Sequence, residues 1–224
     1  MSENICAHLN RRFDHSALAP EVTANTVEAL CADALAFDFR TVAINPVWVS
    51  LAAGILDGST TGVLSVAGFP LGASRTEIKV AEAVRAVGDG ASEIDMVANI
   101  GWLISGEIAR VETEIHALRQ ELPPDVVLKV IVEAPKLTEP LQIDATRAVV
   151  HGGAQFVKTS TGFFGGATPD QVATLVRAAD GQIEVKASGG IRTLADCRTL
   201  LGLGATRLGS SSCVAIMHQL ETSE

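Results

Sequence analysis

The sequence contains no tyrosine, and aromatic residues make up only 4% of its 224 positions. Its histidines show neither H-x-H nor H-E-x-x-H spacing, so we expect no catalytic metal. Its four cysteines include no C-x-x-C pair and match no zinc motif, which favours reduced thiols over a metal-binding or disulfide framework. Neither metal nor cofactor chemistry is indicated by these patterns.

Positive charge is scarce as well, since 17 basic residues face 26 acidic ones and the net charge is −9. Such a chain repels phosphate backbones, which excludes a general nucleic-acid binder, although backbone N–H groups can still hold a small phosphorylated substrate. No apolar run is long enough for a membrane span, and the first four residues lack the features of a signal peptide. We therefore expect a cytoplasmic protein with no membrane partner. A homodimer is the candidate assembly.

Hydrophobic residues make up 47% of the chain, enough for a large core, and no linker or repeat interrupts it. Short β-branched runs alternate with helical stretches, which predicts one domain over residues 1–224. The eight predicted strands are Arg12–Ala17, Thr41–Asn45, Gly62–Ala67, Glu93–Asn99, Val127–Glu133, Gln155–Ser160, Glu184–Ser188 and Arg207–Gly209.

Several helix start signals follow these strands. Helical spacing of apolar residues predicts helices over Thr76–Val87, Ile108–Leu122 and Pro169–Ala179. Pro20 and Pro46 suit first helical turns, and Ser74 with Glu77 and Thr168 with Gln171 have capping-box spacing. Eight strand–helix units predict a (β/α)₈ TIM barrel, with a doubly wound sheet as the alternative, and no G-x-G-x-x-G follows the first strand.

Charged residues inside these strands are informative, because a parallel sheet is covered on both faces. Lys158 and Lys186 lie at inward-facing positions of the sixth and seventh strands, so we expect them to be neighbours. Two close ammonium groups, partly desolvated, lower the pKa of a lysine toward neutrality, and a nucleophilic amine must be neutral. Asp95 on the fourth strand would offset this charge and could move protons through a water.

Each of these positions also has a plainer interpretation, since a strand lysine often reaches solvent and Asp95 could form a structural ion pair. Lys129 and Glu133 share a face of the fifth strand and are candidates to pair with the same groups. His15 follows Asp14 on the first strand and could reach the site, whereas His116 and His151 fall on helix surfaces.

Glycine- and serine-rich turns follow the last strands, where barrels commonly bind phosphate. Ser188-Gly189-Gly190 ends the seventh strand and Gly209-Ser210-Ser211 the eighth, while Gly162 opens a third flexible loop. Glycine lets the backbone approach a phosphate and serine adds a donor, so these turns predict a phosphate site.

These segments together resemble the deoxyribose-phosphate aldolase family of class I aldolases over nearly the whole chain. The resemblance is carried by Asp14-His15-Ser16, Gly68-Phe69-Pro70-Leu71-Gly72, Glu93-Ile94-Asp95-Met96-Val97, Leu128-Lys129-Val130-Ile131, Val157-Lys158-Thr159-Ser160-Thr161-Gly162-Phe163 and Val185-Lys186-Ala187-Ser188-Gly189-Gly190-Ile191-Arg192. The V-K-T-S-T-G and K-A-S-G-G-I-R segments, in this order and spacing, are highly specific.

The resemblance implies a barrel that reversibly cleaves 2-deoxy-D-ribose 5-phosphate without a cofactor, in deoxyribonucleoside catabolism. It gives Lys158 the Schiff-base role and Asp95 the proton relay. It gives Lys186 two roles, as a proton donor or acceptor and as the group that perturbs the Lys158 pKa. The implied substrate-binding residues are Asp14, Thr161, Gly162, Gly189, Gly190, Gly209, Ser210 and Ser211.

The chain departs from the family at four places. Ala43 stands where many members carry cysteine, Ala67 occupies a usual valine position, and Ala134-Pro135-Lys136 follows Glu133. The tyrosine that some members use near the C-terminus is missing. Two rival functions stay open: a Schiff-base aldolase for another phosphorylated sugar, and a sugar-phosphate-binding barrel that has lost catalysis.

Overall fold

A computed structural model describes Cys6 and residues 8–222, and it contains a closed barrel of eight parallel strands joined in sequence order. The predicted absence of a signal peptide concerns residues outside this described part. The strands are β1 Phe13–Ala17, β2 Thr41–Ile44, β3 Gly62–Ala67, β4 Glu93–Val97, β5 Val127–Ile131, β6 Phe156–Lys158, β7 Glu184–Ser188 and β8 Arg207–Ser210. The predicted TIM barrel is thus confirmed, and the closure of β1 onto β8 excludes the open doubly wound sheet.

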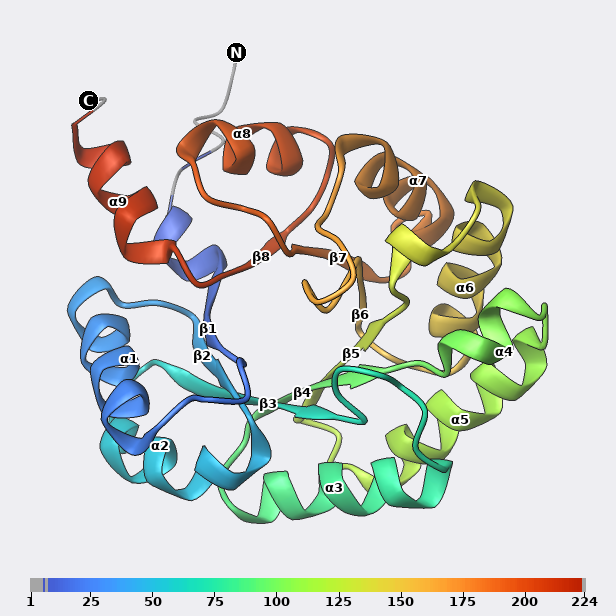
Figure 1. Ribbon diagram of the computed structural model, residues 1–224, viewed down its shortest axis with the longest axis horizontal. Helices are drawn as coiled ribbons and strands as arrows, with labels where there is room; N and C mark the ends of the chain where they lie inside the picture. The colour runs from blue at the N-terminus through green and yellow to red at the C-terminus, as the bar shows by residue number, and fades with distance from the viewer. Residues whose placement is uncertain (1–5, 7, 223–224) are drawn as a thin grey trace.

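Helices form an outer ring around the strands (Figure 1). The α-helices are α1 Ala24–Phe37, α2 Val49–Leu56, α3 Thr76–Gly88, α4 Ile100–Ile104, α5 Ile108–Glu121, α6 Glu139–His151, α7 Pro169–Ala179, α8 Leu194–Gly202 and α9 Cys213–Glu221. Three 3-10 turns, η1 Leu9–Arg12, η2 Pro46–Trp48 and η3 Ala134–Lys136, complete the described elements. None of the helices within the described part has the length and hydropathy needed to cross a membrane.

The predicted helix signals succeed at some positions and fail at others. Thr168 and Gln171 form the expected capping box at α7, and Pro46 opens η2. The box predicted for Ser74 and Glu77 is wrong, because α3 begins one residue later and Arg75 takes the N-cap position. Pro20 does not open a helix either, since α1 starts at Ala24 behind a cap made by Thr23 and Thr26.

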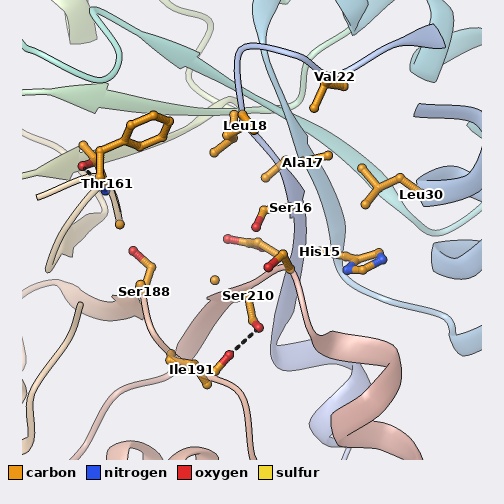
Figure 2. A pocket seen from close by; sticks show the side chains of 18 of the residues that line it. His15, Ser16, Ala17, Leu18, Val22, Leu30, Thr161, Ser188, Ile191 and Ser210 are labelled. Atoms are coloured by element: carbon orange, nitrogen blue, oxygen red, sulfur yellow. Dashed lines mark hydrogen bonds between the residues drawn. The ribbon is translucent and has the colours of Figure 1, made fainter. Parts of the chain in front are cut away.

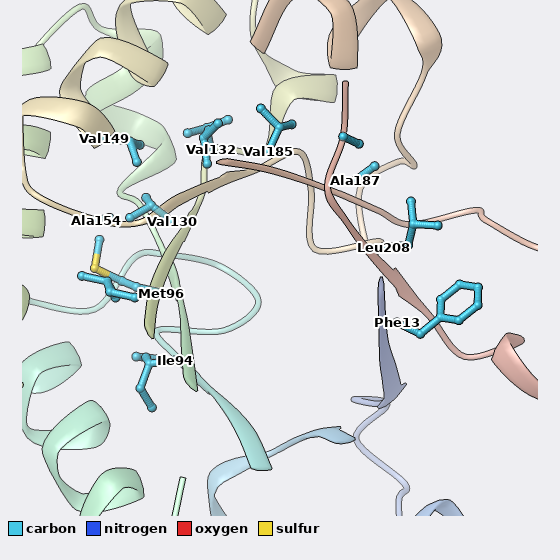
Figure 3. Close-up of a cluster of buried hydrophobic side chains, with 14 of the residues drawn as sticks. Phe13, Ile94, Met96, Val130, Val132, Val149, Ala154, Val185, Ala187 and Leu208 are labelled. Atoms are coloured by element: carbon cyan, nitrogen blue, oxygen red, sulfur yellow. The ribbon is translucent and has the colours of Figure 1, made fainter. Parts of the chain in front are cut away.

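The main hydrophobic core lies between the strands and the helices. Figure 3 shows outward-facing side chains of this layer, among them Ile94 and Met96 of β4 and Val130 of β5, all of which are completely buried. Full burial of one such side chain contributes roughly 1.5–3 kcal/mol. Because strand side chains alternate, the intervening residues of β4, Glu93 and Asp95, face the inside of the barrel. A large apolar layer therefore supports a barrel interior that holds charges.

Several strands end earlier than the sequence pattern predicts. Strand β4 stops at Val97, and Asn99 instead caps α4, its side chain accepting a hydrogen bond from the Trp102 N–H. Strand β6 covers only Phe156–Lys158 instead of extending to Ser160. Strand β6 thus ends before the polar run of residues 159–161, of which Thr161 lines the cavity described below.

Candidate active site

A cavity of about 710 Å³ opens at the carboxyl ends of β1, β6, β7 and β8. Figure 2 shows Thr161 and Ser188 on one side of it and Val22 and Leu30 on the other. The sequence-predicted residues that line it are Asp14, Lys158, Thr161, Gly162, Lys186, Gly189, Gly190, Gly209, Ser210 and Ser211. Asp95 does not line the cavity; it lies buried beneath the two lysines.

The two lysines are neighbours, as their strand positions predict. Lys158 of β6 and Lys186 of β7 are register partners, and both are buried. Each Nζ donates a hydrogen bond of 2.7 Å to the same atom, Asp95 Oδ2. The predicted alternation therefore brings two amines onto one carboxylate oxygen at the floor of the cavity.

The surroundings of Lys158 favour its neutral form. Burial is the largest effect on the pKa of Lys158 and lowers it, Asp95 opposes this, and the charge of Lys186 lowers it further, to about 8. The predicted direction is therefore correct, but desolvation contributes more than the neighbouring lysine does. With a pKa near 8, about one tenth of the amine is neutral at pH 7, against far less for a free lysine.

The two aspartates stay ionised despite their burial. Burial alone would raise the pKa of Asp95, but Lys129, Lys158 and Lys186 together hold it well below its usual range. Burial acts on Asp14 in the same way, and cations led by Lys186 hold the pKa of Asp14 below its usual range. Both carboxylates are thus acceptors in a site where burial by itself would protonate them.

A second layer of charge lies below, and two of its members, Arg207 and Glu93, had no predicted role. Arg207 of β8 donates to Asp14 Oδ1 at 2.7 Å and to Glu93 Oε2 at 3.1 Å. Lys129 of β5 forms ion pairs with Glu93 and with Asp95 Oδ1, the latter at 3.2 Å, which confirms the predicted pairing of Lys129. The signal for Arg207 and Glu93 was present, since both are charged residues inside apolar strands.

Glu133 does not join these charges, contrary to the prediction that it shares a face with Lys129. Strand β5 ends at Ile131, so alternation no longer governs Glu133, whose backbone adopts a left-handed conformation with φ 51°. Its Oε2 accepts a hydrogen bond of 3.1 Å from the Thr161 N–H. Glu133 therefore fixes the start of the loop after β6, and burial raises its pKa.

This loop carries an aromatic side chain over the cavity. Phe163 is nearly half exposed, lines the cavity and packs edge-to-face on Phe69, with ring centroids 5.4 Å apart. The Phe163 N–H donates to Thr161 Oγ1 at 3.1 Å, so the turn is held by its own side chains. Sequence reasoning identified the flexible loop but not this aromatic contact.

Glycines at the opposite rim permit close backbone packing. Gly189 and Gly190 have φ of 86° and 76°, a region that favours glycine. A Cβ on Gly209 would lie 3.1 Å from Lys186 Cε and 2.9 Å from Ser188 Cβ. Gly209 is therefore needed as space beside a lysine, in addition to its predicted place in the phosphate turn.

Two serines at this rim differ in their availability. Ser210 is buried, donates to the Ile191 carbonyl at 2.7 Å and accepts from the Ser212 N–H at 2.9 Å, so its hydroxyl is committed internally (Figure 2). Ser211 is exposed in the cavity, two residues before the start of α9 at Cys213. The helix N-terminus carries partial positive charge, which suits an anion next to Ser211.

The remaining candidates lie at the edge of the site or outside it. His15 lines the cavity but points to α1, with Nε2 3.7 Å from Asp33 Oδ2, and burial lowers its pKa. His116 and His151 are exposed on helices, as predicted. Among the described residues no group of three His, Cys, Asp or Glu side chains could hold a metal ion. All four cysteines are buried, and burial raises the pKa of Cys31 to about 11 and of Cys197 to about 12.

Comparison with known proteins supplies independent evidence. No family model matches the chain. The chain is 45% identical to the deoxyribose-phosphate aldolase of Streptococcus gordonii, over 93% of this chain and 95% of that protein. It is 42% identical to the enzyme of the same name from Brevibacillus brevis, over 96% and 97%. The deoxyribose phosphate aldolase of Aeropyrum pernix, described as tetrameric, superimposes with a TM-score of 0.89 at 32% identity, covering 96% of this chain and 92% of that one.

Proposed function

Because the chain belongs to the deoxyribose-phosphate aldolase family, we propose that it reversibly cleaves 2-deoxy-D-ribose 5-phosphate into D-glyceraldehyde 3-phosphate and acetaldehyde. The observation that carries this proposal is Lys158, an amine on the cavity floor with a pKa of about 8. The reaction would consume the sugar phosphate released when deoxyribonucleosides are degraded.

The first steps form a covalent bond between enzyme and sugar. The neutral amine of Lys158 adds to the C1 aldehyde of the open-chain sugar, and the resulting carbinolamine loses water to give an iminium ion. Asp95, whose Oδ2 accepts a hydrogen bond from Lys158 Nζ at 2.7 Å, is placed to stabilise this cation and to exchange protons with it.

The iminium ion then acts as the electron sink for bond cleavage. The C3 hydroxyl loses its proton, the C2–C3 bond breaks, and its electron pair moves toward the iminium nitrogen to form an enamine. D-glyceraldehyde 3-phosphate leaves at this stage. Protonation at C2 and addition of water return Lys158 and release acetaldehyde, with Lys186 and Asp95 as the buried groups nearest to these proton transfers.

The phosphate of the sugar is assigned to the turns after β7 and β8. Gly189 and Gly190 allow the backbone to come close, Ser211 offers a free hydroxyl, and α9 begins beside it. Replacing Ser211 with alanine should raise KM for the phosphorylated sugar about tenfold, the equivalent of a hydrogen bond of about 1.5 kcal/mol to a charged group. KM for unphosphorylated 2-deoxyribose should not change.

Trapping tests the covalent step. Acetaldehyde and borohydride should add one ethyl group to Lys158, detected by mass spectrometry of the intact protein and its peptides. An adduct that survives Lys158→Ala, or no adduct in the wild-type protein, would contradict the mechanism. A coupled assay comparing deoxyribose 5-phosphate with other phosphorylated sugars then distinguishes this aldolase from one with another substrate.

A further inference from the structure

Six ionisable side chains inside the barrel form a closed ring beneath Lys158. The contacts run in the order Asp95, Lys186, Asp14, Arg207, Glu93, Lys129 and back to Asp95. We call these six residues the charge ring. Its side chains come from five strands, and none is more than 9% exposed.

The distances around the charge ring are those of direct ion pairs. Lys186 Nζ lies 2.7 Å from Asp95 Oδ2 and 2.5 Å from Asp14 Oδ2. Arg207 bridges Asp14 and Glu93 at 2.7 and 3.1 Å. Lys129 contacts Glu93 and closes the ring onto Asp95 Oδ1 at 3.2 Å. Every carboxylate in the ring therefore has two cationic neighbours within it.

The charges of the ring cancel. Its three carboxylates contribute three negative charges, and its two lysines and one arginine contribute three positive charges. Lys158 stands outside this balance, and its ion pair is with Asp95 Oδ2, an oxygen that Lys186 already contacts. A proton on Lys158 would be a surplus positive charge in a buried region, where an unmatched charge is costly.

We propose that Glu93, Lys129 and Arg207 are positioning residues that set the proton affinity of Lys158 by fixing the net charge of the ring beneath it. None of the three lines the cavity, and they act through Asp95 and Asp14. The inference rests on the proposed Schiff-base function of Lys158, because it explains how that amine is kept available for attack.

Other charged groups near Lys158 do not belong to the ring. Glu133, which follows β5, is held by the Thr161 N–H and forms no ion pair with any described residue of the ring, and its interaction with the charge of Lys158 is common to all the variants below. Arg40 approaches Glu93 from the opposite end of the barrel at 3.6 Å, but its side chain is 46% exposed and therefore screened by solvent. Lys158 contacts the ring directly through Asp95, and the remaining members of the ring are linked to it through that carboxylate and its neighbours.

The proposal predicts shifts of opposite sign for opposite charge removals. Arg207→Gln or Lys129→Gln leaves a surplus negative charge and should raise the Lys158 pKa. Glu93→Gln leaves a surplus positive charge and should lower it. At an effective dielectric constant near 20, one unit charge at a separation of about 10 Å shifts a pKa by about one unit. The double variant Glu93→Gln/Arg207→Gln restores neutrality and should return the pKa to within a few tenths of the wild-type value.

The measurement is the pH profile of kcat/KM for deoxyribose 5-phosphate, which reports the pKa of the free enzyme. Titration of the substrate phosphate affects all variants equally and cancels in the comparison. Arg177→Gln is the matched control, because Arg177 forms an ion pair of 2.6 Å with Glu139 on the exposed surface of α6 and α7. This control should leave the profile unchanged, and Arg207→Lys, which keeps the charge, should retain the wild-type pKa.

Shifts of the same sign in Glu93→Gln and Arg207→Gln, or no shift in either, would overturn the proposal. If Arg207→Gln does not fold, the double variant is compared with Glu93→Gln, and equal pKa values in these two would overturn it as well. Acetaldehyde trapping separates the two levels of inference. No adduct in the wild-type protein contradicts the proposed function, whereas a normal adduct with unshifted profiles contradicts only the role of the charge ring.

Discussion

Two lysines of this protein are buried against a carboxylate at almost the same distance, yet their surroundings differ. Lys79 of α3 lies 2.8 Å from Glu114 of α5, outside the barrel, and Lys158 lies 2.7 Å from Asp95 inside it. Burial lowers the pKa of both lysines. A desolvated amine beside a carboxylate is therefore not enough to mark a reactive group.

The difference lies in how each carboxylate is shared. Lys79 also donates to the Val97 carbonyl at 2.8 Å, and Glu114 Oε2 accepts from the Asn99 N–H at 3.1 Å. In that pair one lysine faces one carboxylate, and neither residue lines the cavity. Lys158 shares Asp95 with two other lysines and faces the cavity. Excess positive charge and access to a ligand, more than burial, distinguish the site from a structural ion pair.

The sharpest test of this comparison is to remove each lysine in turn. Lys158→Met should reduce kcat/KM for deoxyribose 5-phosphate by roughly 10⁴-fold or more, because no nucleophile remains. Lys79→Met should still form the acetaldehyde adduct. The comparison is wrong if a folded Lys158→Met protein retains substantial activity in the coupled assay.

The second test replaces the carboxylate partner of each lysine, Asp95 inside the barrel and Glu114 outside it. Asp95→Asn should lower kcat by about 10²–10⁴-fold, the usual range for a group that transfers protons. Glu114→Gln, the matched change outside the barrel, should alter kcat little. Steady-state kinetics on proteins with native circular dichroism measure both, and similar losses in the two variants would show that Asp95 acts only by supporting the fold.

For stability we expect the Lys79–Glu114 pair to matter more than it does for activity. Lys79→Met leaves the Glu114 carboxylate buried without its cation, which should cost about 3–5 kcal/mol in the free energy of unfolding. Urea denaturation at pH 7 measures this loss. The double variant Lys79→Met/Glu114→Leu should recover most of it, and a stable Lys79→Met protein would contradict the structural assignment.

The smallest expected effect is a pH dependence of stability at Lys158. Its folded pKa of about 8 lies below the unfolded value of about 10.5, so the unfolded chain binds more protons between these limits. Wild-type stability should therefore gain about 3 kcal/mol from this group as the pH rises from 8 to 10.5. Lys158→Met lacks this gain, so its stability relative to wild type should be greater at pH 7 than at pH 10. Equal differences at both pH values would contradict the assigned pKa.

The barrel and the juxtaposition of the two lysines could be predicted because both depend on local periodicity. Alternation along β6 and β7 is enough to place Lys158 and Lys186 on neighbouring inward positions, and the parallel register confirms it. Arg207 carried the same signal but was not assigned, since its partner Asp14 is 193 residues away and meets it only when β8 closes onto β1.

Predictions failed where a strand or helix ends. Glu133 was placed by alternation, but the left-handed backbone at this residue and Pro135 in η3 end the regular strand before it. The capping box at Ser74 failed because spacing alone does not say which residue is the N-cap, and Arg75 occupies that place. These boundaries depend on tertiary contacts, such as the Thr161 N–H on Glu133, that a local pattern does not contain.

The burial of the cysteines has a consequence for how this protein meets electrophiles. Cys31, Cys197 and Cys213 are buried, and their raised pKa values keep them as weakly nucleophilic thiols. The described residues that line the cavity include no cysteine, and position 43 contributes only a methyl group there. A small reactive carbonyl that enters the cavity therefore meets amines and no thiol among the described lining residues, and we expect Lys158, the amine whose pKa is lowered to about 8, to be the attachment point for aldehyde-based active-site labels.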